Sequence, residues 1–502
     1  MNRTAAAALQ HALHALRSDG VVQLRVGWCD LHGNLRGKTL VLGNDDKSIA
    51  AAVDSLSAGI GMVGTLLLKD TADRTALPVW GADGGASASQ IDDPAQDLLA
   101  RLAGAANVLL HVDPDSLRRL PWAPDTAWLR AQAAFTDGGT VPLDSRAVLQ
   151  RALAGLAEAG FGLTVGIELE FHIHRITDDG LDPEQAGWPA AAPAVRHLHA
   201  GHQLLGEIAA DQSDQALAIV RQTALGLGLP LRSLEIELGP SQFEAVFGTL
   251  DALAAADAVV LFRNGVRQAL RRAGFHASFA CKPPLVHSVA SGWHLHQSLR
   301  DVGLGKAGGN AFLRATPAAD VAPGDARLVL SDVGAHWLGG LRAHAAGMTA
   351  LCVPSLAGYD RFQGGQMAPQ RAVWGFDNRG AMLRVLGAAG QPATRIENRI
   401  AEPMANPYLA LAAQVWAGLD GVRRQLSPGP ASESPYSAAD AADLPSSLHQ
   451  ALEGLAADRV LLVGMGPELA AVFDSVKRFE IARHAAADDP ADWLTREYFA
   501  RF

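Results

Sequence analysis

The sequence predicts an α+β protein with two domains. Segments rich in Ala and Leu with helical spacing alternate with short strands that carry charged residues, a pattern typical of an antiparallel sheet covered by helices. The chain has 502 residues, of which 49% are hydrophobic, enough for more than one buried core. A segment rich in Pro and charge, LRRLPWAPDTA, covers residues 117–127. We therefore predict an N-terminal domain at residues 1–117 and a C-terminal domain at residues 124–502.

The N-terminal part begins with an amphipathic helix predicted at residues 1–17. Residues 21–30 alternate in polarity and predict a strand, and the turn-rich LHGNLRGK leads to a second short strand. Residues 81–89, GADGGASAS, predict a loop, and residues 108–112 predict a short apolar strand.

The C-terminal part alternates predicted helices and strands. The helices are expected at residues 146–159, 250–273, 406–419 and 448–455. The strands are expected within LTVGIELEFHI, SLEIELGPSQFEAVF, SGWHLHQSL and RIENRI. Residues 426–447 are polar and rich in Pro and Ser, and they predict a surface loop.

Composition excludes several classes of function. The formal net charge is -10, which argues against nucleic acid or an anionic membrane as the main partner. The three cysteines, Cys29, Cys281 and Cys352, form no CxxC pair, so a disulfide framework is not expected and a cytoplasmic location fits. No run of 18 apolar residues predicts a transmembrane helix.

Polar side chains two residues apart recur in four predicted strands. Residues with this spacing share one face of a strand, so each set is expected to point the same way. The residues are Glu168 and Glu170; Glu235 and Glu237, with Glu244 on the other side of the turn LGPSQF; His294 and His296; Arg395, Glu397 and Arg399. Any one pair alone would more often be a solvated strand face. Recurrence on four strands predicts a polar cavity, and oxygen-rich sites with at most one imidazole suit Mg²⁺ or Mn²⁺.

Arginines cluster in the same part of the sequence. Their guanidinium groups match carboxylate and phosphate oxygens, and phosphoryl transfer depends on this kind of charge neutralisation. The cluster consists of Arg361, Arg379, Arg384, Arg395 and Arg399. A network of surface ion pairs is the alternative. The segment DVGLGKAGG, residues 301–309, lacks the context of a phosphate-binding P-loop and is interpreted as a flexible loop.

In order and spacing these segments resemble the glutamine synthetase family. The matching motifs are DLHG (30–33) with RGK (36–38), GIELEF (166–171), ELGPSQFE (237–244), FACKP (279–283), SGWHLHQS (291–298), YDRF (359–362), AP (368–369), NR (378–379), RIENR (395–399) and ANPY (405–408). The resemblance implies a β-grasp-like N-terminal domain and a glutamine synthetase-type catalytic domain. It also implies a ring-shaped homo-oligomer.

The resemblance implies a role for each candidate residue. One Mg²⁺ or Mn²⁺ would be held by Glu170, Glu237 and Glu244, and another by Glu168, His294 and Glu397. The ATP contacts would be Lys282, His296, Ser298, Arg379, Arg384 and Arg395. Glutamate, or the transferred phosphoryl group, would be bound by Arg361, Arg399 and Gly292, and the catalytic arginines would be Arg361, Arg379 and Arg399. The implied reaction passes through γ-glutamyl phosphate, which an amine then attacks.

Two departures from the family pattern concern the amine. The Asp-Gly-Ser-Ser loop that helps bind ammonium is missing, and residues 57–65 read SAGIGMVGT instead. Met367 stands where the family has a glutamate before Ala-Pro. An apolar replacement does not favour a desolvated cation, so we expect a larger and less cationic amine. Met367, Trp293, Trp374 and Phe376 suggest an apolar pocket for an aromatic or alkyl amine such as aniline, although the aromatic residues could equally be core.

Other readings stay open. The amine could instead be putrescine or ammonium. The protein could also be a non-catalytic relative, but retention of all the implied metal ligands argues against that role. Val289 and Ala290 replace an Asn-Gly pair expected to help hold glutamate, and Ser241 replaces a usual glycine. These changes leave open whether the acid is unmodified glutamate.

Overall fold

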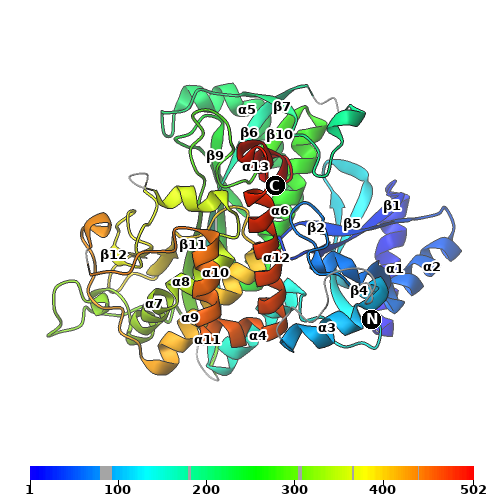
Figure 1. Ribbon diagram of the computed structural model, residues 1–502. Coiled ribbons are helices and arrows are strands. Elements are labelled where there is room, and N and C mark those ends of the chain that lie inside the picture. The colour runs from blue at the N-terminus through cyan, green and yellow to red at the C-terminus, as the bar shows by residue number, and fades with distance from the viewer. Residues whose placement is uncertain (80–92, 179–181, 304–307, 364–366, 439) are drawn as a thin grey trace.

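The computed structural model describes residues 1–79, 93–178, 182–303, 308–363, 367–438 and 440–502 (Figure 1). The predicted loop at 81–89 and the central part of the predicted loop at 301–309 lie outside these residues. Within the described chain, helices and strands mix as the α+β prediction requires. A search of the described helices for one long and apolar enough to cross a bilayer finds none.

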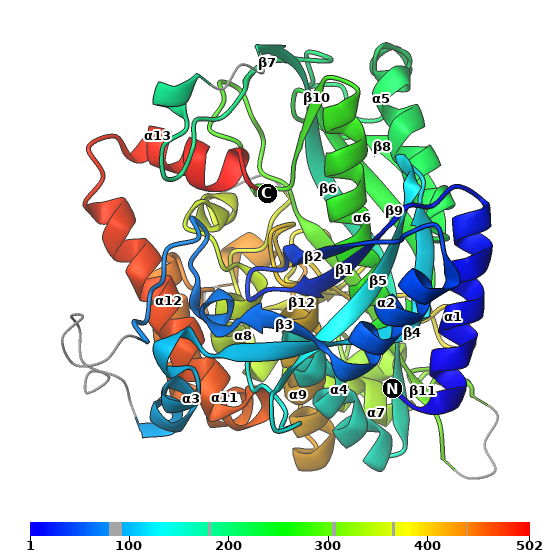
Figure 2. The same cartoon turned by 90° about the vertical axis from the view of Figure 1, so that its right-hand side faces the viewer.

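A five-stranded sheet forms the N-terminal part. Its order is β2-β1-β5-β4-β3, with β1 and β5 parallel and the other pairs antiparallel. The strands are β1 (Gln23–Cys29), β2 (Leu35–Val41), β3 (Ile60–Val63), β4 (Asn107–Leu120) and β5 (Ala123–Phe135). The accompanying helices are α1 (Arg3–Ser18), α2 (Asp46–Ala58) and α3 (Gln96–Arg101). Figure 2 shows this sheet facing the viewer, with α1 and α2 beside it.

The structure corrects the boundary predicted at residues 117–124. That segment is the tip of the β4–β5 hairpin, and β5 pairs with β1 in the centre of the N-terminal sheet. The sheet therefore continues to Phe135, and the strand predicted at 108–112 extends from Asn107 to Leu120. Proline and charge are typical of a tight hairpin turn as well as of a linker, which is why this segment resembled a boundary.

The second sheet has nine strands and contains most of the predicted site. Its order is β12-β13-β14-β11-β6-β9-β8, and β7 and β10 pair with the far half of β6. The strands are β6 (Phe161–Asp178), β7 (Ala194–His197), β8 (Leu231–Ile236), β9 (Gln242–Asp251), β10 (Phe275–Ser278), β11 (Trp293–Asp301), β12 (Trp374–Phe376), β13 (Leu383–Leu386) and β14 (Arg395–Asn398). The pairs are antiparallel except β12–β13.

Helices cover this sheet. The helix α5 packs on β8, and α4 and α6 pack on β6. The helices are α4 (Ser145–Glu158), α5 (Glu207–Gly226), α6 (Ala252–Arg272), α7 (Asp332–Ala343), α8 (Ala345–Cys352), α9 (Pro407–Arg424), α10 (Leu448–Ala457), α11 (Arg459–Met465), α12 (Pro467–Ala485) and α13 (Pro490–Leu494). The four helices predicted from the sequence correspond to α4, α6, α9 and α10, so those predictions are confirmed within a few residues at each end.

Polar contacts join the N-terminal sheet to the rest of the chain. The buried guanidinium of Arg263 on α6 donates to the carbonyl oxygens of Gly33, Pro403 and Ala405. The Asn406 amide donates to the carbonyls of Asp30 and Leu31 while its oxygen caps α9. The two segments that these bonds join are the DLHG and ANPY motifs, residues 30–33 and 405–408. They therefore hold the two sheets in a fixed relation.

A second set of contacts uses the end of the chain. Arg483 on α12 forms an ion pair with Asp70 and a bidentate ion pair with Glu497. The side chains of both acids are fully buried. Thr71 donates to Glu497 from its hydroxyl and to Glu480 from its backbone. Figure 1 shows α12, in red, at the junction between the blue N-terminal part and the remainder.

Candidate active site

Strand register brings the predicted acidic and histidine residues together. Glu168 on β6 lies opposite His294 on β11, and Glu170 lies opposite Glu244 on β9. On the other side of β11, His296 lies opposite Glu397 on β14. Directly opposite residues on adjacent strands have neighbouring side chains. Four adjacent strands therefore present one polar patch, as the spacing predicted.

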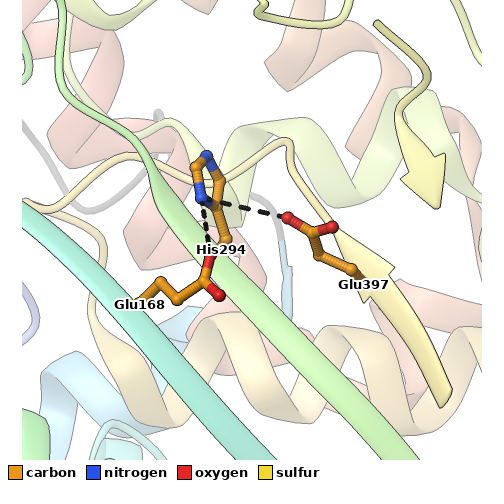
Figure 3. Close-up of side chains that lie close together, drawn as sticks. All are labelled: Glu168, His294 and Glu397. Carbon is orange, nitrogen blue, oxygen red and sulfur yellow. Dashed lines mark hydrogen bonds and ion pairs between the residues drawn. The ribbon is translucent and has the colours of Figure 1, made fainter. Parts of the chain in front are cut away.

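His294 stands at the centre of this patch. Its Nδ1 atom lies 3.2 Å from Glu168 Oε2 and 3.9 Å from Glu397 Oε1 (Figure 3). One ligand atom from each of these three residues fits within a span of 4.8 Å. That trio is the second predicted metal site.

A second trio adjoins the first. Glu170, Glu244 and His294 also place ligand atoms within 4.8 Å of one another. The His294 Nε2 atom lies 3.7 Å from Glu170, and Nδ1 lies 3.8 Å from Glu244. The family resemblance implied a different third ligand for this metal site, Glu237 in place of His294. Glu237 is near enough for the Glu170 charge to help raise its pKa, but it stands outside the compact trio.

Like charges make the patch a candidate cation site. Burial, and then the charges of Glu170 and Glu168, raise the pKa of Glu244 to about 10. Burial and Glu170 raise the pKa of Glu237 to about 8. For Glu168 the effect of burial is outweighed by hydrogen bonds from His294 and His296, which lower its pKa. Crowded carboxylates with one imidazole suit a hard divalent cation, which would offset their mutual repulsion.

Two arginines hold Glu397. Arg384 donates from Nη1 at 3.0 Å to one carboxylate oxygen, and Arg399 donates to the other. Burial would raise the pKa of Glu397, but His294 and Arg399 outweigh it and lower the pKa. Arg399 also donates to the backbone carbonyls of Arg379 at 3.1 Å and Met367 at 3.2 Å. The segment that carries Met367 is thus tied to the patch through one guanidinium.

Arg361 lies beside the patch and is buried. Its Nη atoms donate to the carbonyls of Arg399, Ile400 and Ala401, and its other N–H groups have no acceptor among the described residues. A Cβ atom at Gly292 would approach Arg361 Nη2 to 2.6 Å and His294 Nε2 to 3.0 Å. Glycine at this position therefore lets the guanidinium sit over the backbone next to the metal-ligand candidates.

A cavity of about 480 Å³ opens on the other side of Glu168. His296, Ser298 and Arg395 line it, so the structure brings these three predicted nucleotide contacts together. Arg395 Nε donates to His296 Nδ1 at 3.0 Å, so His296 carries its proton on Nε2 and donates it to Glu168 at 2.9 Å. This chain of hydrogen bonds fixes one wall of the cavity.

Three other predicted nucleotide contacts lie away from this cavity. Arg384 is engaged with Glu397 and Asp377, while Arg379 and Lys282 are exposed. None of the three is among its described lining residues.

The structure corrects the proposed apolar amine pocket. Trp293 alternates with His294 on β11, points to the opposite face and is 1% exposed in the hydrophobic core. Trp374 is buried in the same core, and its indole donates to the carbonyls of Pro428 and Gly429. Phe376 packs edge-on against Trp374. Of the four side chains, Met367 is the exposed one, at 47%, with its backbone at the patch.

Two supporting residues were not assigned roles from the sequence. Gln242 donates to Glu170 at 3.1 Å and to Ser291 at 3.0 Å, and its two-residue spacing from Glu244 could have indicated this. Glu402 is buried and accepts hydrogen bonds from the backbone N–H and the hydroxyl of Ser355, a contact that no local sequence pattern indicates.

Ser241, which replaces a usual glycine of the family, adopts a left-handed φ of 57°. Its hydroxyl accepts a hydrogen bond from the Leu198 N–H, which anchors this strained turn.

Comparisons with known proteins agree with this geometry. The family model described as "Glutamine synthetase, catalytic domain" matches residues 142–498. A gamma-glutamylanilide synthase from Acinetobacter sp is 35% identical, with 98% of this chain and 95% of that protein covered. A glutamate–isopropylamine ligase from Pseudomonas sp is 31% identical, with 65% of this chain and 66% of that protein covered.

Solved structures with the same fold cover nearly the whole chain. A GmaS/ADP complex has a TM-score of 0.72 and 27% identity, with 96% of this chain and 98% of that chain covered. The catalytic-domain match alone covers more than half of the chain, and it starts after the N-terminal sheet ends. This protein therefore belongs to the glutamine synthetase family of ligases.

Proposed function

We propose that this enzyme joins the γ-carboxylate of glutamate to an organic amine, at the expense of ATP, to give a γ-glutamyl amide. The observation that carries the proposal is the patch of Glu168, Glu170, Glu244, His294 and Glu397 beside a cavity large enough for a nucleotide. Its relatives include an enzyme named for a γ-glutamylanilide product and one named for isopropylamine as a substrate.

The reaction has two steps. The γ-carboxylate attacks the terminal phosphorus of ATP, and ADP leaves, which gives γ-glutamyl phosphate. The amine nitrogen then attacks the acyl carbon, phosphate leaves with the bonding electrons, and the nitrogen loses one proton to the departing phosphate or to water. A divalent cation held by the two trios would supply charge neutralisation for the phosphoryl and carboxylate oxygens.

The chain's own residues have positioning roles in this proposal. Arg395 and His296 form the wall of the nucleotide cavity, and Ser298 adds a hydroxyl to the same wall. The free N–H groups of Arg361 would bind an anionic oxygen of glutamate or of the transferred phosphoryl group. Arg399 would fix the Met367 segment over the acyl carbon, since it bonds both Met367 and Glu397.

An organic amine is favoured over ammonium by the side chain at position 367. A carboxylate is what a bound ammonium ion requires, and Met367 offers none. An aromatic amine such as aniline is the substrate that we propose, because it is neutral at pH 7 and has an apolar body. Because Trp293 and Trp374 lie in the core, Met367 is the main side chain that would contact the apolar body of the amine.

The direct test measures phosphate release from ATP with Mg²⁺ and glutamate, in the presence of ammonium, putrescine, isopropylamine or aniline. Release with an organic amine but not ammonium, with a product of the amide mass, supports the proposal. Release with ammonium alone would make the enzyme an ammonia-using glutamine synthetase. No release with any amine would direct attention to the acid, since Val289 and Ala290 depart from the family there. Glu170→Ala is the inactive control.

A further inference from the structure

A second cavity lies away from the candidate active site. Its volume is about 650 Å³, and residues from the end of α6, the start of β10 and the C-terminus line it. Figure 1 and Figure 2 show these three parts of the chain near one another. The segment at residues 190–193 closes one side. It shares no lining residue with the cavity at His296 or with the two carboxylate trios.

The wall of this cavity is strongly basic. Arg267, Arg271, Arg272 and Arg501 all line it, and none of its described lining residues is Asp or Glu. This is unexpected in a chain whose formal net charge is -10. Gln268 adds a donor, because its oxygen is already used by Arg25 and Trp122 while its amide N–H groups are not.

Arg267 is the residue that ordinary packing does not explain. It follows the buried Arg263 by one helical turn on α6, and Arg271 follows it by another. Arg263 has three carbonyl partners, whereas no described residue accepts a hydrogen bond from the Arg267 side chain or pairs with it. Burial, Arg263 and Arg501 together lower the pKa of Arg267 to about 10. A partly buried cation among cations is costly unless an anion joins it.

The helix dipole accounts for only part of this cluster. Arg271 and Arg272 occupy the last turn of α6, where basic residues are favoured by the helix C-terminus. Arg267 lies a turn earlier, and Arg501 comes from the other end of the chain. His276 is neutral at pH 7 and adds no positive charge, because burial lowers its pKa to about 4, and its Nε2 lies 2.8 Å from the Phe499 carbonyl.

We infer that this cavity is a binding site for a small organic polyanion that carries two or more carboxylate or phosphate groups. The guanidinium groups of Arg267 and Arg271 would bind the anionic groups, with bidentate geometry available to each. Ala190, Pro193 and Phe275 provide the apolar wall for the body of the ligand. The volume is that of ordinary small-molecule sites. The inference is independent of the amide ligase reaction, since no residue of the candidate active site takes part.

The test measures binding to the metal-free protein, whose active-site carboxylates repel anions. Citrate and fructose 1,6-bisphosphate are the carboxylate and phosphate probes, and acetate at equal ionic strength is the monovalent control. Calorimetry and the thermal unfolding midpoint are expected to show saturable binding of at least one polyanion. The tighter probe identifies the preferred group. A rise in the midpoint that acetate reproduces, or no binding, would overturn the inference.

Variants locate the site. Arg267→Met is expected to weaken binding at least about tenfold, because a charge-assisted hydrogen bond is lost. Without the probe, its thermal midpoint should equal or exceed that of the wild type, since an unpaired cation has been removed. Arg271→Met, at an exposed position, is the second variant if the first fails to fold. Arg423→Met, in the last turn of α9, is the matched control and should bind normally. Equal loss in Arg423→Met, or normal binding by Arg267→Met and Arg271→Met, would contradict the assignment.

Discussion

Glu244 shows how a side chain can oppose folding and still be required for function. It is buried opposite Glu170, and its pKa of about 10 in the absence of a cation means that the folded state holds a proton that the unfolded chain releases. The folded-state pKa lies above the unfolded value of 4.5. Its contribution to stability is therefore present below pH 4.5 and is lost as the pH rises toward 10.

Glu244→Gln is the first prediction. The variant should lose at least about a hundredfold in ATP turnover, because an ion ligand is removed. In metal-free buffer its thermal midpoint should exceed that of the wild type by an amount that grows from pH 5 to pH 9. Activity assays and thermal unfolding across that pH range measure both effects. Equal turnover of the two proteins would refute the ligand assignment.

The side chain at position 367 is the second prediction. Met367→Glu should shift the ratio of ammonium-supported to aniline-supported turnover toward ammonium by about tenfold or more, because a carboxylate can balance an ammonium charge. Rates of phosphate release with each amine give the ratio. Met367→Leu should keep the wild-type preference. An unchanged ratio in Met367→Glu would mean that other residues choose the amine.

At the level of single residues, strand spacing predicted the patch well. Glu168, Glu170, His294 and Glu397 meet as expected from a two-residue period. The same period places Trp293 on the face opposite His294, so the sequence already contained the evidence against a pocket role. The carbonyl partners of Arg361 could not be predicted, because they depend on where the chain turns after β14.

Among the helices, His344 joins three elements through its ring. It lies between α7 and α8, and it contacts Asp420 of α9 at 2.9 Å and Asp458, at the start of α11, at 2.7 Å. Burial opposes its protonation, but hydrogen bonds to Asp458 and Asp420 outweigh burial and raise its pKa. Its contribution to stability is therefore complete below pH 6.5 and is lost as the pH rises through the raised folded-state value.

His344→Gln is the third prediction. At pH 6 the variant should lose about 1.5 to 3 kcal/mol of unfolding free energy, the usual contribution of hydrogen bonds to charged groups. The difference from the wild type should shrink toward pH 9. Chemical denaturation at both pH values measures it. His449→Gln, which removes an exposed pair with Glu453, serves as the control and should change little. A difference that grows with pH would contradict the assigned charge.

Elements were easier to predict than their boundaries. The buried helices α6 and α9 and the strands β6, β9 and β11 have strong periodicity, and the sequence predicted each of them. The β4–β5 hairpin was divided at its proline-rich tip, because local composition cannot show that both arms pair within one sheet. Pairing with β1, whose residues lie 103 positions earlier in the chain, is a tertiary contact that composition does not report.

Across the whole molecule, Arg483 connects the start of the chain to its end. Its partners Asp70 and Glu497 are fully buried, so removing the guanidinium leaves both carboxylates without an ion-pair partner among the described residues. This network could not be predicted from the sequence, since its members lie far apart along the chain and follow no pattern. The ring-shaped homo-oligomer implied by the family resemblance stays a prediction, which the mass of the native particle can test.

Arg483→Met is the fourth prediction. At pH 8 the variant should lose about 3 to 5 kcal/mol of unfolding free energy, because a buried ion pair is broken from one side. The loss should be smaller at pH 5, since burial raises the pKa of Glu497 to about 7 and protonation removes its charge. Equilibrium denaturation measures both values. Arg496→Met, which removes a half-exposed pair with Asp492, should cost at most about 1 kcal/mol. Equal losses in the two variants would exclude the network as a major support.

The separation of these partners along the chain affects how the protein is made. Asp70 and Arg483 are 413 residues apart, and Thr71 and Glu497 are 426 residues apart. At translation rates of about 5 to 20 residues per second, Asp70 leaves the ribosome roughly 20 to 80 s before Arg483 exists. During that interval Asp70 and Thr71, in the N-terminal part, lack their partners Arg483 and Glu497. A ribosome stalled before α12 would therefore carry the nine-stranded sheet with its candidate metal ligands in place. The N-terminal part of the same chain would still lack its contacts with α12 and the C-terminal residues.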